Sequence, residues 1–184
     1  MLTRFGKPAA PADAVDLLLE CHERIRAFLA MARRIGEARD AEQDEVREAA
    51  RRVHRYFTQA LPLHARDEED SILPRLRGRD AEVDAALDAM AREHALHEAP
   101  LSTLTARCDV VAADPARHAA LAPEILAATA ELERHFAEHL SREEAVIFPA
   151  MRRLLDATTD AAIVREIRAR RGVSEAPGPA AAPR

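Results

Sequence analysis

Glycine and β-branched residues are scarce in this chain of 184 residues. Only five glycines occur, and valine and isoleucine are sparse beside alanine, leucine, glutamate and arginine. This composition favours helices, because the abundant residues have high helix propensity whereas strands are enriched in β-branched side chains. We therefore expect an all-α protein, and at this length one domain with one core.

Long apolar runs and paired cysteines are also missing. No run of about 18 apolar residues occurs, and the amino terminus has no apolar segment of signal-peptide length. Cys21 and Cys108 form no CxxC motif, so we expect two reduced thiols, with Cys21 acting as a small buried apolar residue. These absences predict a soluble, cytoplasmic protein with no membrane partner.

Clustered charge of one sign is lacking too. The 27 basic and 32 acidic residues give a formal net charge of -5, and the basic residues are scattered through every segment. A surface that follows a phosphate backbone needs them gathered into a patch or stripe. We therefore expect no nucleic-acid partner.

Helix-start signals divide the chain into five helices. They are Asp13, Asp40 with Gln43, Asp80 after Gly78, Asp114 before Pro115, and Thr159. The predicted helices span residues 12–38, 41–77, 80–112, 115–155 and 160–171. Short connections between long helices force antiparallel neighbours, so we predict an up-down-up-down antiparallel four-helix bundle with a short C-terminal helix, forming a domain over residues 12–172. The segments 1–11 and 173–184 have little to bury and are expected to be disordered.

A histidine interrupts the apolar stripe of each long helix. These residues are His22, His64, His94 and His139. In two helices a glutamate follows one turn later, giving the i, i+4 pairs His64 with Glu68 and His139 with Glu143. Side chains at this spacing leave the same helix face, so each pair can bind one centre.

These pairs belong to a longer internal repeat. The segment HARDEEDSILP at 64–74 matches HLSREEAVIFP at 139–149 at the histidine, both glutamates, the isoleucine and the closing proline. The other two helices align so that His22 falls on His94. Antiparallel packing of such a pseudo-two-fold pair would bring four imidazoles and two carboxylates together inside the bundle.

This set of side chains predicts a metal centre. Buried ionised carboxylates cost several kcal/mol unless a cation compensates them. Four nitrogen donors and two carboxylates, without a thiolate, suit iron or manganese better than a structural zinc site. If both glutamates bridge two metals, each ion gains two imidazoles and two carboxylate oxygens, and a position stays open for a small molecule.

The pattern H, HxxxE, H, HxxxE, formed by His22, His64 with Glu68, His94, and His139 with Glu143, resembles that of hemerythrin-like (HHE) cation-binding domains. The resemblance covers about residues 15–150 and implies a non-haem centre of two iron ions, with manganese or zinc less favoured. The oxygen carriers of this family have a fifth histidine, in the third helix. At the corresponding position this chain has Glu98, and His97 is the alternative additional ligand.

Other residues near the stripes receive secondary roles. Glu69 and Glu144 point about 100° away from the ligating glutamates and are expected to be solvated or to contact ligands from outside. His54 and His135 are expected to support the core or the ligands, and His118 to lie on the surface. Pro74 and Pro149 should end or bend their helices, and Pro62 and Pro100 should kink theirs.

Three functions fit these features. The first is a di-iron protein that binds or responds to a small oxidant (dioxygen, nitric oxide or peroxide) or to iron. The second is a di-iron redox enzyme that turns over peroxide or nitric oxide, and the third is a metal-free structural bundle. These 184 residues contain no recognisable DNA-binding, receiver or membrane segment, so we expect any sensing output to come from a partner, either a second copy in a homodimer or an unknown protein.

Overall fold

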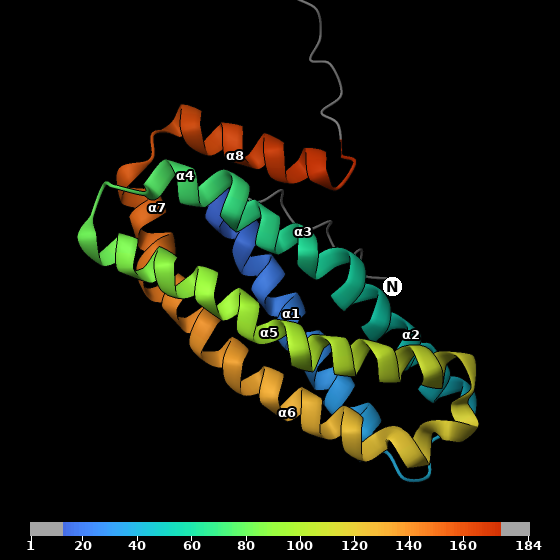
Figure 1. Cartoon of the computed structure of the whole chain (residues 1–184). Coiled ribbons are helices and arrows are strands. Elements are labelled where there is room, and N and C mark those ends of the chain that lie inside the picture. Colours follow the sequence, from blue (N-terminus) through green and yellow to red (C-terminus); the bar gives the residue numbers. More distant parts are fainter. Residues whose placement is uncertain (1–12, 174–184) are drawn as a thin grey trace, which may run out of the picture.

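The structure, a computed structural model, describes residues 13–173. Within this range four long helical stretches follow one another, and a shorter helix completes the fold (Figure 1). No strand occurs between residues 13 and 173. Residues 1–11 and 173–184 were expected to be disordered. Apart from Val173, these segments lie outside the described residues.

The stretches agree with the predicted ranges to within a few residues. The first is α1 (Ala14–Glu37), and the third is α5 (Ala81–Ala113). The second consists of α2 (Gln43–Arg55), η1 (Tyr56–Ala60), α3 (Leu61–Arg66), η2 (Asp67–Ile72) and α4 (Leu73–Leu76). The fourth consists of η3 (Pro115–Arg117), α6 (His118–Arg142), η4 (Glu143–Ile147) and α7 (Phe148–Leu154), and α8 spans Ala157–Arg170. The predicted all-α bundle with a short C-terminal helix is confirmed.

Aspartate side chains cap several helices. Asp13 accepts a hydrogen bond from the Asp16 amide at 2.8 Å, and Asp80 accepts one from the Glu82 amide at 2.9 Å. The last helix begins earlier than predicted, because Asp156 and not Thr159 is its N-cap and accepts from the Thr159 amide at 2.7 Å. The second stretch was predicted to start after Asp40 but begins at Gln43, without a side-chain cap.

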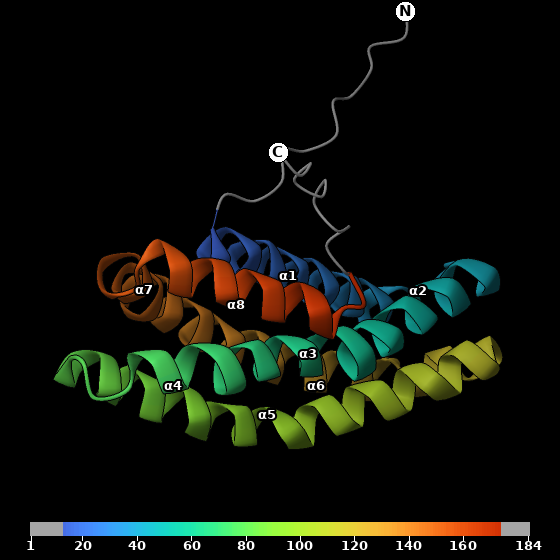
Figure 2. The ribbon, with the colours of Figure 1, turned by 90° about the horizontal axis from the view of Figure 1, so that it is seen from above.

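The helices do not end at Pro74 and Pro149, where the sequence predicted either an end or a bend. A π-helical segment precedes each of Pro62, Pro74 and Pro149, namely η1, η2 and η4. Proline cannot donate an amide hydrogen bond and its ring clashes with the carbonyl of the preceding turn, whereas a wider turn accommodates both effects. The helix therefore continues through each proline. Pro100 lies inside α5 without such a segment, and α5 is bowed in Figure 2.

The apolar core has two parts. One cluster fills the end of the bundle near the α1–α2 connection and includes Ile25, Leu29 and Leu132. The other fills the opposite end and includes Leu18, Ile72 and Leu87. The predicted metal ligands fall between the two clusters along every long stretch, so apolar packing encloses the polar layer from both ends.

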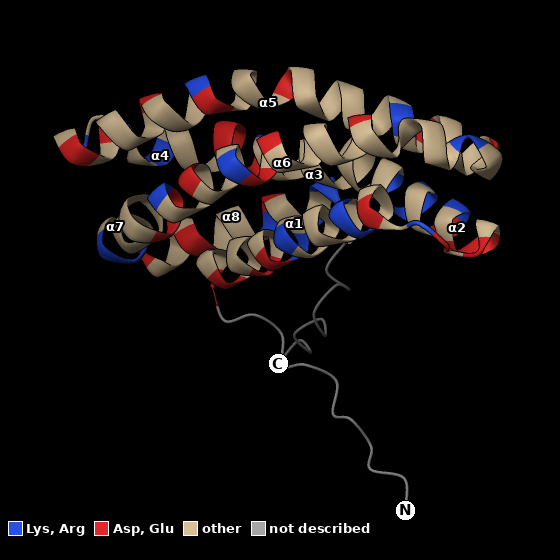
Figure 3. Ribbon diagram, turned by 90° about the horizontal axis from the view of Figure 1, so that it is seen from below, with Lys and Arg blue, Asp and Glu red and all other residues tan. Residues whose placement is uncertain are grey.

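Helix α8 lies outside the four-helix arrangement. It packs against α1 and η2, as Figures 1 and 2 show from two directions. Basic and acidic segments alternate along the helices in Figure 3, and no single-sign stripe follows them in that view. Among the described residues, no helix is both long and apolar enough to cross a membrane.

Candidate metal centre

All six residues predicted as ligands meet at the middle of the bundle. They form two overlapping groups whose candidate ligand atoms lie within 4.8 Å of one another. Group A contains His22 and His64, and group B contains His94 and His139. Glu68 and Glu143 belong to both groups, so the arrangement offers two adjacent positions with four donors each.

Each carboxylate extends one oxygen toward each group. Glu143 places Oε2 2.9 Å from Nε2 of His22 and Oε1 3.1 Å from Nε2 of His139. Glu68 places Oε1 3.0 Å from Nε2 of His64 and Oε2 3.1 Å from Nε2 of His94. The two carboxylates are therefore equivalent under the pseudo-two-fold relation of the sequence, and both are placed to bridge.

The polar atoms of this centre lie close together, but many of them form no hydrogen bond of acceptable geometry. All four carboxylate oxygens, together with Nε2 of His22 and His64, are buried and lack a hydrogen bond of acceptable geometry among the described residues. Glu68 and Glu143 are each only 1 % exposed. Leaving so many buried polar atoms unpaired would be costly, whereas a cation placed between them would satisfy nitrogen and oxygen lone pairs together. The donor set therefore fits metal ions.

The pKa shifts at the centre also indicate that its carboxylates need a compensating positive charge. Burial disfavours the ionised form of Glu68, but the charge of His64 and the close approach of His64 and His94 lower the pKa of Glu68 well below its ordinary value. Burial likewise disfavours protonated His64, yet the Glu68 carboxylate raises the pKa of His64 well above its ordinary value. Without metal, the positive charge of His64 compensates the Glu68 carboxylate, and a bound cation would take over that role.

Three of the four histidines are oriented by an outer carboxylate. Nδ1 of His22 lies 2.7 Å from Glu144, and Nδ1 of His94 lies 2.8 Å from Glu69. Nδ1 of His139 lies 3.0 Å from Glu93. Such partners fix the tautomer and ring direction of a ligating histidine, leaving Nε2 free to bind metal.

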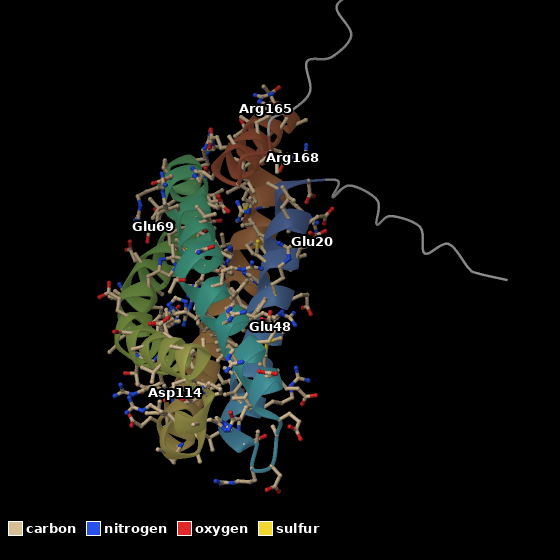
Figure 4. The ribbon with its side chains drawn as sticks, turned by 90° about the vertical axis from the view of Figure 1, so that its right-hand side faces the viewer. Glu20, Glu48, Glu69, Asp114, Arg165 and Arg168 are labelled. Atoms are coloured by element: carbon tan, nitrogen blue, oxygen red, sulfur yellow. The ribbon has the colours of Figure 1, made fainter. Side chains whose placement is uncertain are left out.

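These outer carboxylates come from neighbouring helices. Glu69 stands on the outer side of η2 in Figure 4, and its partner His94 belongs to α5. Glu69 and Glu144 were identified in the sequence as outer groups, but Glu93 was missed. Its role depends on α5 and α6 lying side by side, and a further contact from Arg142 fixes it. No local sequence signal distinguishes Glu93 from a surface residue.

His64 is the exception. Between residues 13 and 173 no carboxylate contacts its Nδ1, and the thiol of Cys21 interacts with the ring instead. Cys21 is buried, as predicted, but Arg171 of the C-terminal segment also lies 3.8 Å from its sulfur. It is thus a polar neighbour of the site and more than an apolar filler.

The π-helical segments carry the two bridging candidates. Glu68 lies in η2 and Glu143 begins η4, and their carbonyls accept hydrogen bonds from the amides of Leu73 and Phe148, five residues later. The prolines that follow each segment account for this widened turn. The repeat in the sequence thus corresponds to a repeated backbone irregularity at the site, where π-helical turns are frequently found.

The remaining histidines take different places. His97 is buried, and its ring centroid lies 5.1 Å from that of His139, but it belongs to neither ligand group. Glu98 is exposed and likewise outside both groups. His54 and His135 are half-buried.

His118 is buried and donates from Nε2 to the Ile35 carbonyl at 2.7 Å, so the prediction of a surface residue is wrong. This hydrogen bond satisfies a carbonyl in the last turn of α1, where backbone carbonyls have no partner within the helix.

Comparison with known proteins agrees with this geometry. The sequence profile of the hemerythrin HHE cation binding domain matches residues 13–151, which include all six residues of the two groups. A search of curated proteins finds no match. Because the matched range covers most of the chain, the protein belongs to the hemerythrin family of HHE cation-binding domains.

Proposed function

We propose that the chain binds two iron ions and uses them to bind or respond to a small oxidant, such as dioxygen, nitric oxide or peroxide, or to iron itself. The observation that carries this proposal is the placement of Glu68 and Glu143, each with one oxygen toward each histidine group. Carboxylates so placed fit two adjacent cations better than one.

The donor chemistry favours iron. Each group would supply two imidazole nitrogens and two carboxylate oxygens, a mixed set typical of non-haem iron sites with open positions. A structural zinc site is usually closed, tetrahedral and rich in thiolates, and no cysteine belongs to either group. Manganese and zinc are therefore less favoured occupants.

The protein's own residues would bind, orient and shield the metals. The four Nε2 atoms and two carboxylates would hold the ions, and Glu69, Glu93 and Glu144 would hold the imidazole rings in place. The two apolar clusters would exclude bulk water from both ends. Bound iron would supply one-electron redox chemistry and a coordination position for a small molecule.

The test combines metal loading with ligand titration. Protein loaded anaerobically with ferrous iron would be freed of excess metal, analysed for iron and then exposed separately to dioxygen, nitric oxide and hydrogen peroxide. A stable spectral adduct would support a binding or sensing role, whereas sustained consumption of the added molecule would support a redox enzyme. Protein that retains no iron, with the same melting temperature in the presence of iron as without it, would favour the metal-free structural bundle.

The proposal includes no nucleic acid and no membrane among the partners, and it places the protein in the cytoplasm. Sensing would require an output, for which we propose a second copy of the chain or another protein. Size-exclusion chromatography of the iron-loaded and metal-free forms would reveal a metal-dependent homodimer.

A further inference from the structure

The pseudo-two-fold relation between the candidate ligands extends to two of their outer partners. Glu144 contacts His22 and Glu69 contacts His94, and each of these glutamates directly follows a bridging candidate in the repeat. The two contacts are nearly equal in length, at 2.7 and 2.8 Å. The surroundings of His22 and His94 therefore obey the same symmetry as the ligands themselves.

The other two histidines depart from this symmetry. Glu93 lies 3.0 Å from Nδ1 of His139, and it directly precedes the ligand histidine of α5. The residue that directly precedes the ligand histidine of α1 is Cys21. The symmetry therefore predicts that the sulfur of Cys21 serves Nδ1 of His64, as a carboxylate serves His139.

The surroundings of Cys21 agree with this prediction. Nδ1 of His64 is buried and forms no hydrogen bond of acceptable geometry between residues 13 and 173, and the thiol of Cys21 interacts with the ring. The two side chains line one cavity of about 240 Å³. A buried ring nitrogen without a partner is unfavourable, and the neighbouring sulfur can accept a hydrogen bond from it.

An arginine accompanies the outer partner on both sides of the centre. In group B, Arg142 forms an ion pair with Glu93. The residue equivalent to Arg142 in the repeat is Asp67, so the repeat provides no arginine at this position in group A. Arg171, at the C-terminal end of α8, instead places Nη2 2.6 Å from Asp67 and 3.8 Å from the sulfur of Cys21. A segment beyond the family profile thus supplies the cation of the group A side.

We propose that Cys21 orients His64: its sulfur accepts a hydrogen bond from Nδ1 and fixes the ring with Nε2 toward the group A metal, as Glu93 does for His139. Arg171 donates to the same sulfur and holds it in place. The proposal rests on the proposed di-iron function and adds an asymmetry to it. Because sulfur accepts hydrogen bonds more weakly than a carboxylate, the two irons should be spectroscopically distinct.

Two replacements of Cys21 separate this role from that of a small apolar side chain. Cys21→Ser keeps an acceptor beside the ring, whereas Cys21→Val keeps an apolar side chain but removes the acceptor. An apolar role predicts that valine is the better substitute, and the proposed role predicts that serine is. Cys108, which is buried in the apolar cluster near the α1–α2 connection, provides the matched controls Cys108→Ser and Cys108→Val.

Each protein would be loaded anaerobically with ferrous iron enriched in the Mössbauer isotope, analysed for iron, and studied by Mössbauer spectroscopy and by competition with a chelator. Cys21→Val should lower the affinity for one iron about 10- to 100-fold, as expected for loss of an outer partner of a ligating histidine, and should alter one quadrupole doublet. Cys21→Ser should retain most of the wild-type affinity. Glu93→Gln should alter the other doublet, and the Cys108 variants should alter neither.

The outcomes separate the two proposals. Wild-type protein that retains fewer than two irons would overturn the proposed function and this role of Cys21 with it. Two irons in the wild type, with Cys21→Val binding iron at least as tightly as Cys21→Ser, would overturn the role of Cys21 alone. Alteration of the same doublet by Cys21→Val and Glu93→Gln would also overturn it. If Cys21→Val did not fold, Cys21→Ala would replace it in both comparisons, because alanine removes the acceptor without adding bulk.

Discussion

Arg170, near the C-terminal end of the fold, places Nη1 2.9 Å from Oδ1 of Asp67, a buried residue 103 positions earlier that directly precedes the bridging candidate Glu68. Arg171 completes the pairing, with Nη2 2.6 Å from Oδ2 of Asp67. Both arginines lie beyond the range that matches the family profile. The carboxyl-terminal segment thus neutralises a buried charge next to the metal centre.

Replacing both Arg170 and Arg171 by methionine would leave the Asp67 carboxylate buried and unpaired. Breaking a buried ion pair in this way typically costs about 3 to 5 kcal/mol. We expect a loss of this size in the free energy of unfolding of the metal-free protein, measured by urea titration. Adding Asp67→Asn to the double variant should recover most of the loss. A double variant as stable as the wild type would contradict this role.

The bridging assignment predicts unequal effects of ligand removal. Glu68→Ala should disturb both metals, because its two oxygens face histidines of different groups. His22→Ala should weaken one metal preferentially, since His22 belongs only to group A. Elemental analysis and absorption spectra of the two iron-loaded variants would reveal the difference. Equal loss of iron from both variants would argue against a carboxylate bridge.

The outer carboxylates should tune affinity without abolishing binding. Glu144→Gln, Glu69→Gln and Glu93→Gln each weaken an orienting contact to one ligand histidine, and we expect iron affinity to fall about 10- to 100-fold. Glu98→Gln is the control, because Glu98 is exposed and belongs to neither ligand group. Competition with a chelator would measure the affinities. A Glu98 variant as weak as the other three would assign a ligand role to Glu98.

Metal-free protein should lose stability as the pH rises through the alkaline range. Burial opposes a charge on His94, but contacts with Glu68 and Glu69 raise the pKa of His94 to about 9. Because the folded pKa exceeds the unfolded value of about 6.5, this contribution is complete below pH 6.5 and disappears as the pH rises through about 9. Urea unfolding in the presence of a chelator at pH 7 and pH 10 would measure the loss, and His94→Gln should reduce it.

The same protonation predicts proton release during metal uptake. His94 is protonated at pH 7 in the metal-free protein and must lose this proton to bind iron. Metal binding in a weakly buffered solution should therefore acidify it, and apparent iron affinity should increase between pH 6 and pH 9. Uptake with no proton release would contradict a protonated His94 in the metal-free protein.

Much of this architecture can be predicted from the sequence because its periodicity is simple. Apolar residues spaced three or four apart define the helices, and short connections make them antiparallel. The repeat around His64 and His139 identifies the side chains that meet, because equivalent positions on paired helices lie at equal depth. The helix ranges were predicted within a few residues for the same reason.

The missed features all depend on contacts between distant segments. Glu93 acquires its role only because α5 lies against α6, and His118 is buried because Ile35 of another helix presents a carbonyl. Proline in a sequence predicts a break, but whether the chain bends, ends or widens into a π-helical turn depends on the packing around it. Pairing of Asp67 with the end of the chain is equally invisible to local patterns.

The most direct test of the central claim is an anomalous difference map of the iron-loaded protein, collected from crystals at the iron absorption edge. The account predicts two peaks per chain, one beside His22 and His64 and one beside His94 and His139, with Glu68 and Glu143 contacting both. A single peak, or two peaks that share neither carboxylate, would contradict it.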